Sequence, residues 1–131
     1  NMNQLTKVLI AIIILTLCII GAGIYTNYIL TNDSTELEKH ITKIQDNIKN
    51  GNWEEAMNEL IRFKEYWSKK QDIWAILQNH FEIDSINTSL ARLTDYIATK
   101  SLPLALSESS VLMEYIQHIP KIIAITLGNI F

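Results

Sequence analysis

The chain of 131 residues carries eleven Lys and Arg against fourteen Asp and Glu, a net charge of −3 at pH 7, and 48% of its residues are hydrophobic. Acidic and basic side chains are interspersed, which argues against nucleic-acid binding because that function needs a clustered basic face. The single cysteine, Cys18, leaves the remainder of the chain without a disulfide, so a domain built from it depends on its core for stability.

The first predicted element is a helix that spans a membrane. No side chain between Val8 and Ile24 is charged, aromatic or an amide. With the largely apolar continuation to Leu30, about 23 residues extend about 34 Å at about 1.5 Å each, enough to cross a hydrocarbon core of about 30 Å. We therefore predict a membrane anchor at residues 1–30, in contact with the lipid bilayer through residues 5–30.

The charges on either side of this helix predict its orientation. Lys7 precedes it, whereas the first charges behind it are acidic, beginning with Asp33 and Glu36. Because positive charge is retained on the cytoplasmic side, we expect a single-pass protein of the cell membrane with a cytoplasmic N-terminus and an extracytoplasmic C-terminal domain. The small residues 21–23 leave a second interpretation open, in which a signal peptidase removes the segment. The length of the apolar stretch around them favours a retained anchor.

A polar hinge is predicted behind the anchor at residues 31–35 (TNDST), followed by a helical domain at residues 36–131. Thr35 and Glu38 have the spacing of a capping box, which begins a helix. Apolar residues then recur at helical steps of three and four along one face: Leu37, Ile41, Ile44 and Ile48.

Three further helices follow, over residues 53–69, 72–100 and 103–119. Gly51 separates the first two helices of the domain, because glycine readily adopts the left-handed conformation found just past a helix end. Pro103 suits the first turn of the last helix. Each helix has a predicted buried side: Trp53, Ala56, Met57, Leu60, Ile61, Lys64 and Trp67; then Ile73, Leu77, Phe81, Ile86, Leu90, Leu93 and Ile97, widened by Trp74, Ile76 and Ile83; then Ala105, Leu112, Ile116 and Ile119.

The last eleven residues, 121–131, are apolar but too short to span a bilayer. We expect them to be extended and to lie over the bundle, with an interfacial segment that returns to the membrane as the alternative. The predicted fold is therefore all-α: an N-terminal transmembrane helix, then an antiparallel bundle of about four helices with an extended C-terminal tail.

Three tryptophans, Trp53, Trp67 and Trp74, are candidates either for the core or for a binding surface. In a short bundle, large aromatic side chains usually fill the core, and we favour this interpretation. If the three rings instead lined an open groove, the domain would be a ligand sensor.

His80, Glu82 and Asp84 form the most suggestive polar cluster. His80 and Asp84 are four residues apart on one helix face and could share a metal ion, whereas Glu82 points elsewhere. A helical metal site needs a third and usually a fourth ligand, which only distant residues could supply. We therefore predict no metal, no cofactor and no catalytic residue, and expect His80 to be a hydrogen-bonding group inside the bundle, with Glu54 or Glu55 as its partner.

Several motifs resemble those of one family. They are G-x-W-x-x-A (Gly51, Trp53, Ala56), W-x-x-L-x-x-H-x-E-I-x-x-I (Trp74, Leu77, His80, Glu82, Ile83, Ile86) and a closing N-I-F at residues 129–131. Together with the anchor, they resemble a family of uncharacterised proteins from clostridia and related Firmicutes, catalogued as a domain of unknown function. The resemblance implies a single-span, mostly helical membrane protein without known catalysis. It also implies a membrane partner, because the family is associated with genes for small integral membrane proteins.

These observations predict a membrane-tethered helical module for interaction or scaffolding with another membrane or envelope protein. We do not expect an enzyme or a nucleic-acid-binding protein, and a homo-oligomer is compatible with the sequence. A ligand sensor with a tryptophan-lined groove is the alternative. A metal-binding protein that uses His80 and Asp84 is a less favoured one.

Overall fold

The computed structural model describes the backbone of residues 3–77 and 80–130 and the side chains of residues 3–77 and 81–119. Within these residues the chain forms helices and no strands. In chain order they are α1 (Gln4–Lys49), α2 (Trp53–Leu77), α3 (His80–Ala98) and α4 (Leu102–Ile130). The predicted all-α fold is confirmed.

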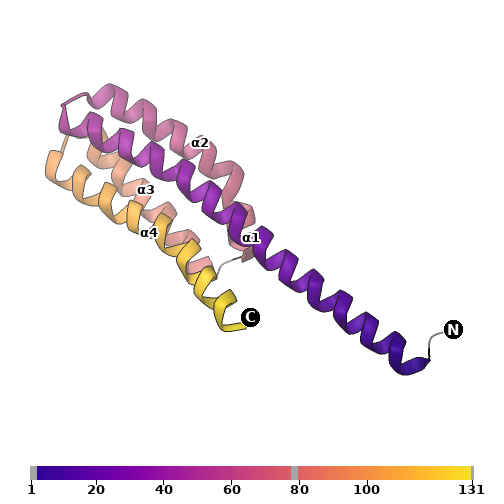
Figure 1. The fold of residues 1–131 in the computed structure, drawn as a ribbon. Helices are drawn as coiled ribbons and strands as arrows, with labels where there is room; N and C mark the ends of the chain where they lie inside the picture. Colours follow the sequence, from indigo (N-terminus) through magenta and orange to yellow (C-terminus); the bar gives the residue numbers. More distant parts are fainter. Residues whose placement is uncertain (1–2, 78–79, 131) are drawn as a thin grey trace.

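The helices form two hairpins that pack side by side (Figure 1). Helix α1 packs against α2 and α4, and α3 packs against α4 and α2, so the C-terminal part of α1 belongs to the bundle. The N-terminal part of α1 projects beyond the bundle as a single rod. The connection between α1 and α2 lies at the far end of the bundle from this rod, and so does the connection between α3 and α4.

The projecting part of α1 has the character of a membrane span. Its apolar stretch is not buried by the rest of the protein, and α1 is the one helix among the described residues that is long and apolar enough to cross a membrane. The first fully buried side chain along α1 is that of Leu30. Length and composition thus support the predicted anchor, and the bundle begins where the predicted anchor ends.

The predicted hinge at residues 31–35 is wrong, because α1 continues through it without interruption. Thr35, predicted to cap a new helix, instead donates its side-chain hydroxyl to the carbonyl oxygen of Thr31 at 2.9 Å, an arrangement found inside helices. Asp33 and Ser34 are only 2% and 4% exposed. Their polar groups have partners on neighbouring helices, so this polar stretch does not need to be a loop.

The predicted apolar stripes of α1 and α4 are confirmed. All of their members are buried: Leu37, Ile41, Ile44 and Ile48 in α1, and Ala105, Leu112, Ile116 and Ile119 in α4. In α2, Ala56, Leu60 and Trp67 are buried as predicted, whereas Ile61 is 45% exposed. Phe63 is buried although it was not predicted to be.

The predicted boundary between the second and third helices lies too early in the chain. Helix α2 continues to Leu77, so Asp72 does not begin a helix and Trp74 belongs to α2. Trp67 and Trp74 are seven residues apart, close to two helical turns, and both face the core. Of the polar residues between them, Ser68, Lys69 and Asp72 are exposed, whereas Lys70 contacts Asp33 in α1 and Gln71 contacts Asn87 in α3, so a break there is not needed.

This shift also changes which residues of the predicted third stripe are buried. Ile83, Ile86, Leu90, Leu93 and Ile97 are buried as expected. Three apolar residues near the connection between α2 and α3 are not, namely Ile73 (41% exposed), Ile76 (84%) and Phe81 (75%). Helix α2 ends at Leu77 and α3 begins at His80, so these positions belong to two helices and do not continue one periodic stripe.

Helix α4 continues to Ile130, so the last residues are helical where an extended tail was predicted. Pro120 lies inside this helix and has no N–H to donate to the carbonyl oxygen of Ile116. The hydroxyl of Ser34 in α1 donates to that carbonyl oxygen instead, at 3.0 Å, in a buried position. The helix can pass through the proline because α1 satisfies the acceptor that the proline leaves without a partner.

Candidate functional site

The most extensive polar arrangement in the described chain lies between α1 and α2. We call it the polar seam, and it consists of Asp33 and His40 from α1 and Glu55, Glu59, Arg62, Tyr66, Lys70 and Trp74 from α2. Its members alternate with the apolar side chains that hold the two helices together.

One half of the polar seam is centred on the carboxylate of Asp33. Tyr66 donates its hydroxyl to Oδ1 at 3.3 Å, and Trp74 donates its indole N–H to Oδ2 at 3.2 Å. The ammonium of Lys70 lies 3.6 Å from Oδ1. These three residues follow each other at intervals of four on α2, so three successive turns converge on one buried carboxylate.

The other half is centred on Glu59, which is 3% exposed. The Nδ1 atom of His40 lies 2.5 Å from Oε1, and the guanidinium of Arg62 donates to Oε2 at 2.6 Å. Burial by itself raises the pKa of Glu59, but the hydrogen bonds with His40 and Arg62 outweigh it, so this pKa is lower than usual. Arg62 also contacts Glu55 at 3.1 Å, which carries the seam to the protein surface.

Tyr66 connects the two halves. Its ring lies 6.2 Å from the ring of His40, centroid to centroid, while its hydroxyl contacts Asp33. Burial, together with the negative charge of Asp33, raises the pKa of Tyr66 to about 12. Tyr66 therefore remains a neutral hydrogen-bond donor across the physiological pH range.

The polar seam acts as a clamp that holds α1 against α2. Each of its two buried carboxylates accepts hydrogen bonds or ion pairs from at least two different side chains. Removing one donor would leave a buried charge with fewer partners, which is costly. The seam therefore fixes the rotation and the register of α1 against α2, directly behind the projecting part of α1.

The tryptophans do not share one groove. Trp67 and Trp74 are buried and pack edge to face with ring centroids 5.3 Å apart. Trp67 also donates its indole N–H to Oδ1 of Asn87 in α3 at 2.8 Å. The predicted core role is thus confirmed for these two. Trp53 is only partly buried and lies at the other end of α2.

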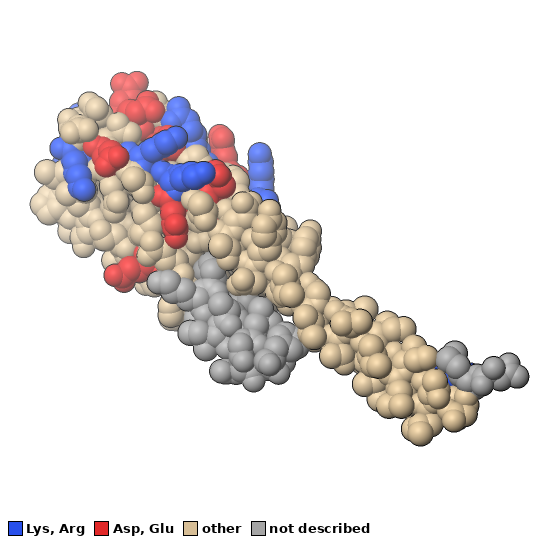
Figure 2. Space-filling view, in the orientation of Figure 1, with Lys and Arg blue, Asp and Glu red and all other residues tan. Residues whose placement is uncertain are grey.

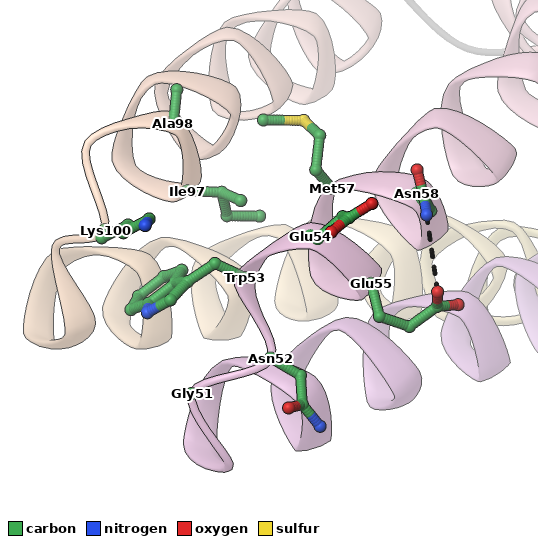
Figure 3. A pocket seen from close by; sticks show the side chains of 10 residues that line it. All are labelled: Gly51, Asn52, Trp53, Glu54, Glu55, Met57, Asn58, Ile97, Ala98 and Lys100. Carbon is green, nitrogen blue, oxygen red and sulfur yellow. Dashed lines mark hydrogen bonds between the residues drawn. The ribbon is translucent and has the colours of Figure 1, made fainter.

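Trp53 lines a pocket at the end of the bundle far from the projecting part of α1. Figure 3 shows this end pocket, which has a volume of about 610 Å³. Its apolar wall comes from Trp53, Met57, Ile97 and Ala98, and its charged groups come from Glu54, Glu55 and Lys100. It forms where the turn between α1 and α2 meets the end of α3. No sequence pattern predicts this pocket beyond the two turns that end the helices.

Of the predicted polar cluster, Glu82 and Asp84 lie within the described side chains, and the side chain of His80 lies outside them. Asp84 is exposed and lines a shallow hollow of about 220 Å³ together with Phe81 and Arg92. The predicted hydrogen bond of His80 with Glu54 or Glu55 therefore also lies outside the described side chains; Glu54 and Glu55 themselves belong to the first turn of α2. Among the described residues, no three His, Cys, Asp or Glu side chains are grouped as metal ligands would be.

The central members of the polar seam are absent from the predicted site residues. Asp33 falls in the predicted hinge, and Tyr66 and Lys70 belong neither to a predicted buried stripe nor to a candidate cluster. One signal was available: Glu59 occurs between the buried positions Ala56, Leu60 and Phe63, where a carboxylate needs a partner. The partner itself, His40, is nineteen residues away and is found only when the hairpin is formed.

One family model matches the chain, over residues 24–130, and its description is "Domain of unknown function (DUF4363)". The match begins at the end of the apolar stretch of α1 and includes the whole bundle. No curated protein and no solved structure matches the chain.

Proposed function

The chain belongs to the family of the domain of unknown function DUF4363, and we propose that it is a membrane-tethered helical module that binds or scaffolds another membrane or envelope protein. The observation that carries the proposal is the continuity of α1. One helix runs from the apolar stretch into the buried core, with no break at residues 31–35. A bundle joined to a membrane span in this way has a fixed orientation relative to that span.

The polar seam supports the same proposal. A continuous helix transmits orientation only if its neighbours cannot slide or rotate around it. Asp33 lies directly behind the end of the apolar stretch and is held by Tyr66, Lys70 and Trp74. Such a clamp is of little use to a domain on a flexible tether, but it suits a module that presents a surface to a partner in the same membrane.

We further propose that the bundle is extracytoplasmic. The support is the charge distribution: Lys7 lies before the apolar stretch, and no charged residue follows until Asp33. A reporter that is active only outside the cytoplasm, fused after Phe131, is expected to be active. Activity of a cytoplasmic reporter at the same position would reverse this assignment.

The scaffolding proposal is tested by breaking the connection between span and bundle. A four-residue Gly-Ser insertion after Leu30 interrupts α1, and the same insertion at Gly51 serves as the control because it only lengthens a turn. Cross-linking of the full chain in native membranes is expected to give one dominant membrane-protein adduct with the wild type and with the control. The adduct should be lost with the insertion after Leu30, while circular dichroism still shows a helical protein. Equal adducts in all three proteins would contradict the proposal.

A ligand sensor is not favoured as a second function. That alternative requires Trp53, Trp67 and Trp74 to line one open groove. Two of the three rings are buried in the core, and the third lies at the end pocket.

A further inference from the structure

The bundle exposes large apolar side chains at the end from which α1 projects. Ile76, in the last turn of α2, is 84% exposed, and Phe81, in the first turn of α3, is 75% exposed. Ile73, one turn before Ile76, is 41% exposed. We call these three residues the base of the bundle. A single exposed apolar side chain needs no explanation, but two this exposed within six positions indicate a contact surface.

The hairpin geometry gives the height of the base relative to the membrane span. Helices α1 and α2 leave the turn at Gly51 in opposite chain directions and pack against each other with the same rise per residue. Ile76 follows Gly51 by twenty-five residues, and Thr26 precedes it by twenty-five. Ile76 therefore lies at about the level of Thr26 on α1. The contacts at the polar seam agree with this register, since Lys70 pairs with Asp33.

The level of Thr26 is where the apolar stretch of α1 ends. The uninterrupted apolar run stops at Ile24, and Tyr25 and Tyr28 follow it with 66% and 68% of their surface exposed. Tyrosine is enriched at the boundary between hydrocarbon and headgroups, because its ring is apolar and its hydroxyl is polar. By this register, Ile76 lies at about the level of the two tyrosines that mark the boundary of the span.

The distribution of charge follows the same division. No charged residue occurs between Val8 and Asn32. In the face shown in Figure 2, the acidic and basic side chains gather over the part of the bundle far from the projecting rod. A protein seated on lipid should have most of its charges away from the membrane in this way. At the base itself, the acidic residues Glu82 and Asp84 follow Phe81 at the start of α3.

We propose that the base of the bundle is a lipid-contacting surface: Ile76 and Phe81 insert into the interfacial region of the bilayer, beside Tyr25 and Tyr28. The occupant is the membrane in which α1 is anchored, since this interface is continuous with the apolar surface of the span. The inference rests on the proposed membrane anchoring. It adds that the bundle is seated on the bilayer and does not stand clear of it.

The test measures the depth of single sites in the full chain reconstituted into phosphatidylcholine–phosphatidylglycerol vesicles. Cys18 is first replaced by Ala, so that each of the variants Leu15→Cys, Ile76→Cys and Ile61→Cys has a single cysteine, which is labelled with an environment-sensitive fluorophore. The lipids carry a nitroxide quencher at either a shallow or a deep position of the acyl chain. Ile61 is the matched control, because it is 45% exposed on the same helix but about 22 Å farther from the membrane at about 1.5 Å per residue. All three sites are exposed apolar positions, and circular dichroism confirms that the variants fold.

We expect the probe at position 76 to be quenched at least twofold more by shallow than by deep nitroxides, and the probe at position 61 to be unaffected. The probe at position 15 should be quenched mainly by deep nitroxides. Quenching at 15 without quenching at 76 would overturn the lipid-contacting base and leave the anchoring intact. Absence of quenching at 15 would overturn the anchoring and the base together. A third outcome is a probe at position 76 that is not quenched but has blue-shifted emission, with a blue shift that disappears when more lipid is added per protein. This outcome would assign the base to contact with a second copy of the chain and would also overturn the inference.

Discussion

Asp33 and Trp74 are joined by a buried hydrogen bond of 3.2 Å although they are forty-one residues apart. Asp33 belongs to the part of α1 that follows the apolar stretch, and Trp74 belongs to the last turns of α2. The bond therefore ties the end of the first hairpin to the point where α1 leaves the bundle. Tyr66 and Lys70 contact the same carboxylate, so three side chains of α2 hold α1 in place where it leaves the bundle.

Replacement of Asp33 by Ala is expected to lower the free energy of unfolding by about 3 kcal/mol, because it leaves the buried indole N–H of Trp74 and the partly buried hydroxyl of Tyr66 without their acceptor and Lys70 without its counter-charge. Chemical denaturation of the full chain in detergent, followed by circular dichroism, measures the change. Asp72→Ala is the control, since Asp72 is exposed on α2, the helix that carries Trp74, and its effect should be within about 0.5 kcal/mol. If both variants unfolded alike, the clamp would have no energetic role.

Much of the bundle could be predicted from local sequence, because apolar periodicity reports which face of a helix is buried. The stripe from Leu37 to Ile48 and the stripe from Ala105 to Ile119 needed no knowledge of their partners. Gly51 predicted the first turn for an equally local reason: its φ of 74° is in the left-handed region.

The predictions of a hinge at residues 31–35 and of a helix boundary before Asp72 were wrong for the same reason. Residues 31–35 and the segment between Trp67 and Trp74 are rich in polar side chains, and polar residues are ordinarily read as solvent-exposed breaks. Asp33 is instead buried by partners that lie more than thirty positions away. Periodicity cannot reveal such a pair, because Asp33 has no apolar signature and its carboxylate is satisfied only in the folded hairpin.

Tyr66 should make the fold sensitive to alkaline pH. Its pKa rises from an ordinary value of 10 to about 12 in the folded protein. The neutral form is thus favoured by folding, and this stabilisation is complete below pH 10 and is lost as pH rises through 12. Titration of tyrosinate absorbance at 295 nm should show one tyrosine that ionises near pH 12, and Tyr66→Phe should remove this step alone. A step that persists in the variant would assign the shifted tyrosine to another position.

Glu59 predicts the opposite dependence at acid pH. Its pKa is lower in the folded protein than the ordinary value of 4.5, so folding favours the charged form. The resulting stabilisation is present above pH 4.5 and is lost as pH falls below it. The melting temperature of the wild type should fall over this range more steeply than that of Glu59→Gln, which has no carboxyl group to titrate. Parallel curves would show that other carboxyl groups determine the acid sensitivity.

The two turns at the end pocket offer a matched pair of substitutions. Gly51 donates to Ile48 O at 3.1 Å and Lys100 to Ile97 O at 3.1 Å, and each residue has a positive φ, of 74° and 56°. Both helices thus end in the same left-handed motif, once with glycine and once with lysine. Lys100→Gly should stabilise the protein by about 1 kcal/mol, and Gly51→Ala should destabilise it by about 1 kcal/mol.

The sign of each change identifies its cause. A methyl group at Gly51 would meet no atom within 4 Å, so a loss there reports the backbone conformation and not a clash. Lys100→Ala provides the control for the loss of the lysine side chain without relief of the backbone. If Lys100→Gly and Lys100→Ala changed the denaturation midpoint equally, the left-handed conformation would not be the source of the gain.

Ser34 and Pro120 should be energetically coupled across the interface between α1 and α4. The hydroxyl of Ser34 donates at 3.0 Å to the carbonyl oxygen of Ile116, which is the acceptor that the N–H of residue 120 would use if that residue were not proline. Ser34→Ala therefore leaves a buried carbonyl without a donor and should cost about 1–2 kcal/mol of stability.

In a Pro120→Ala background, the backbone N–H of residue 120 donates to this carbonyl oxygen instead, and Ser34→Ala should cost less than about 0.5 kcal/mol. A double-mutant cycle with Ser34→Ala, Pro120→Ala and the double variant, measured by chemical denaturation, should give a coupling of about 1 kcal/mol. Additive effects would mean that Ser34 contributes to the interface without compensating for the proline.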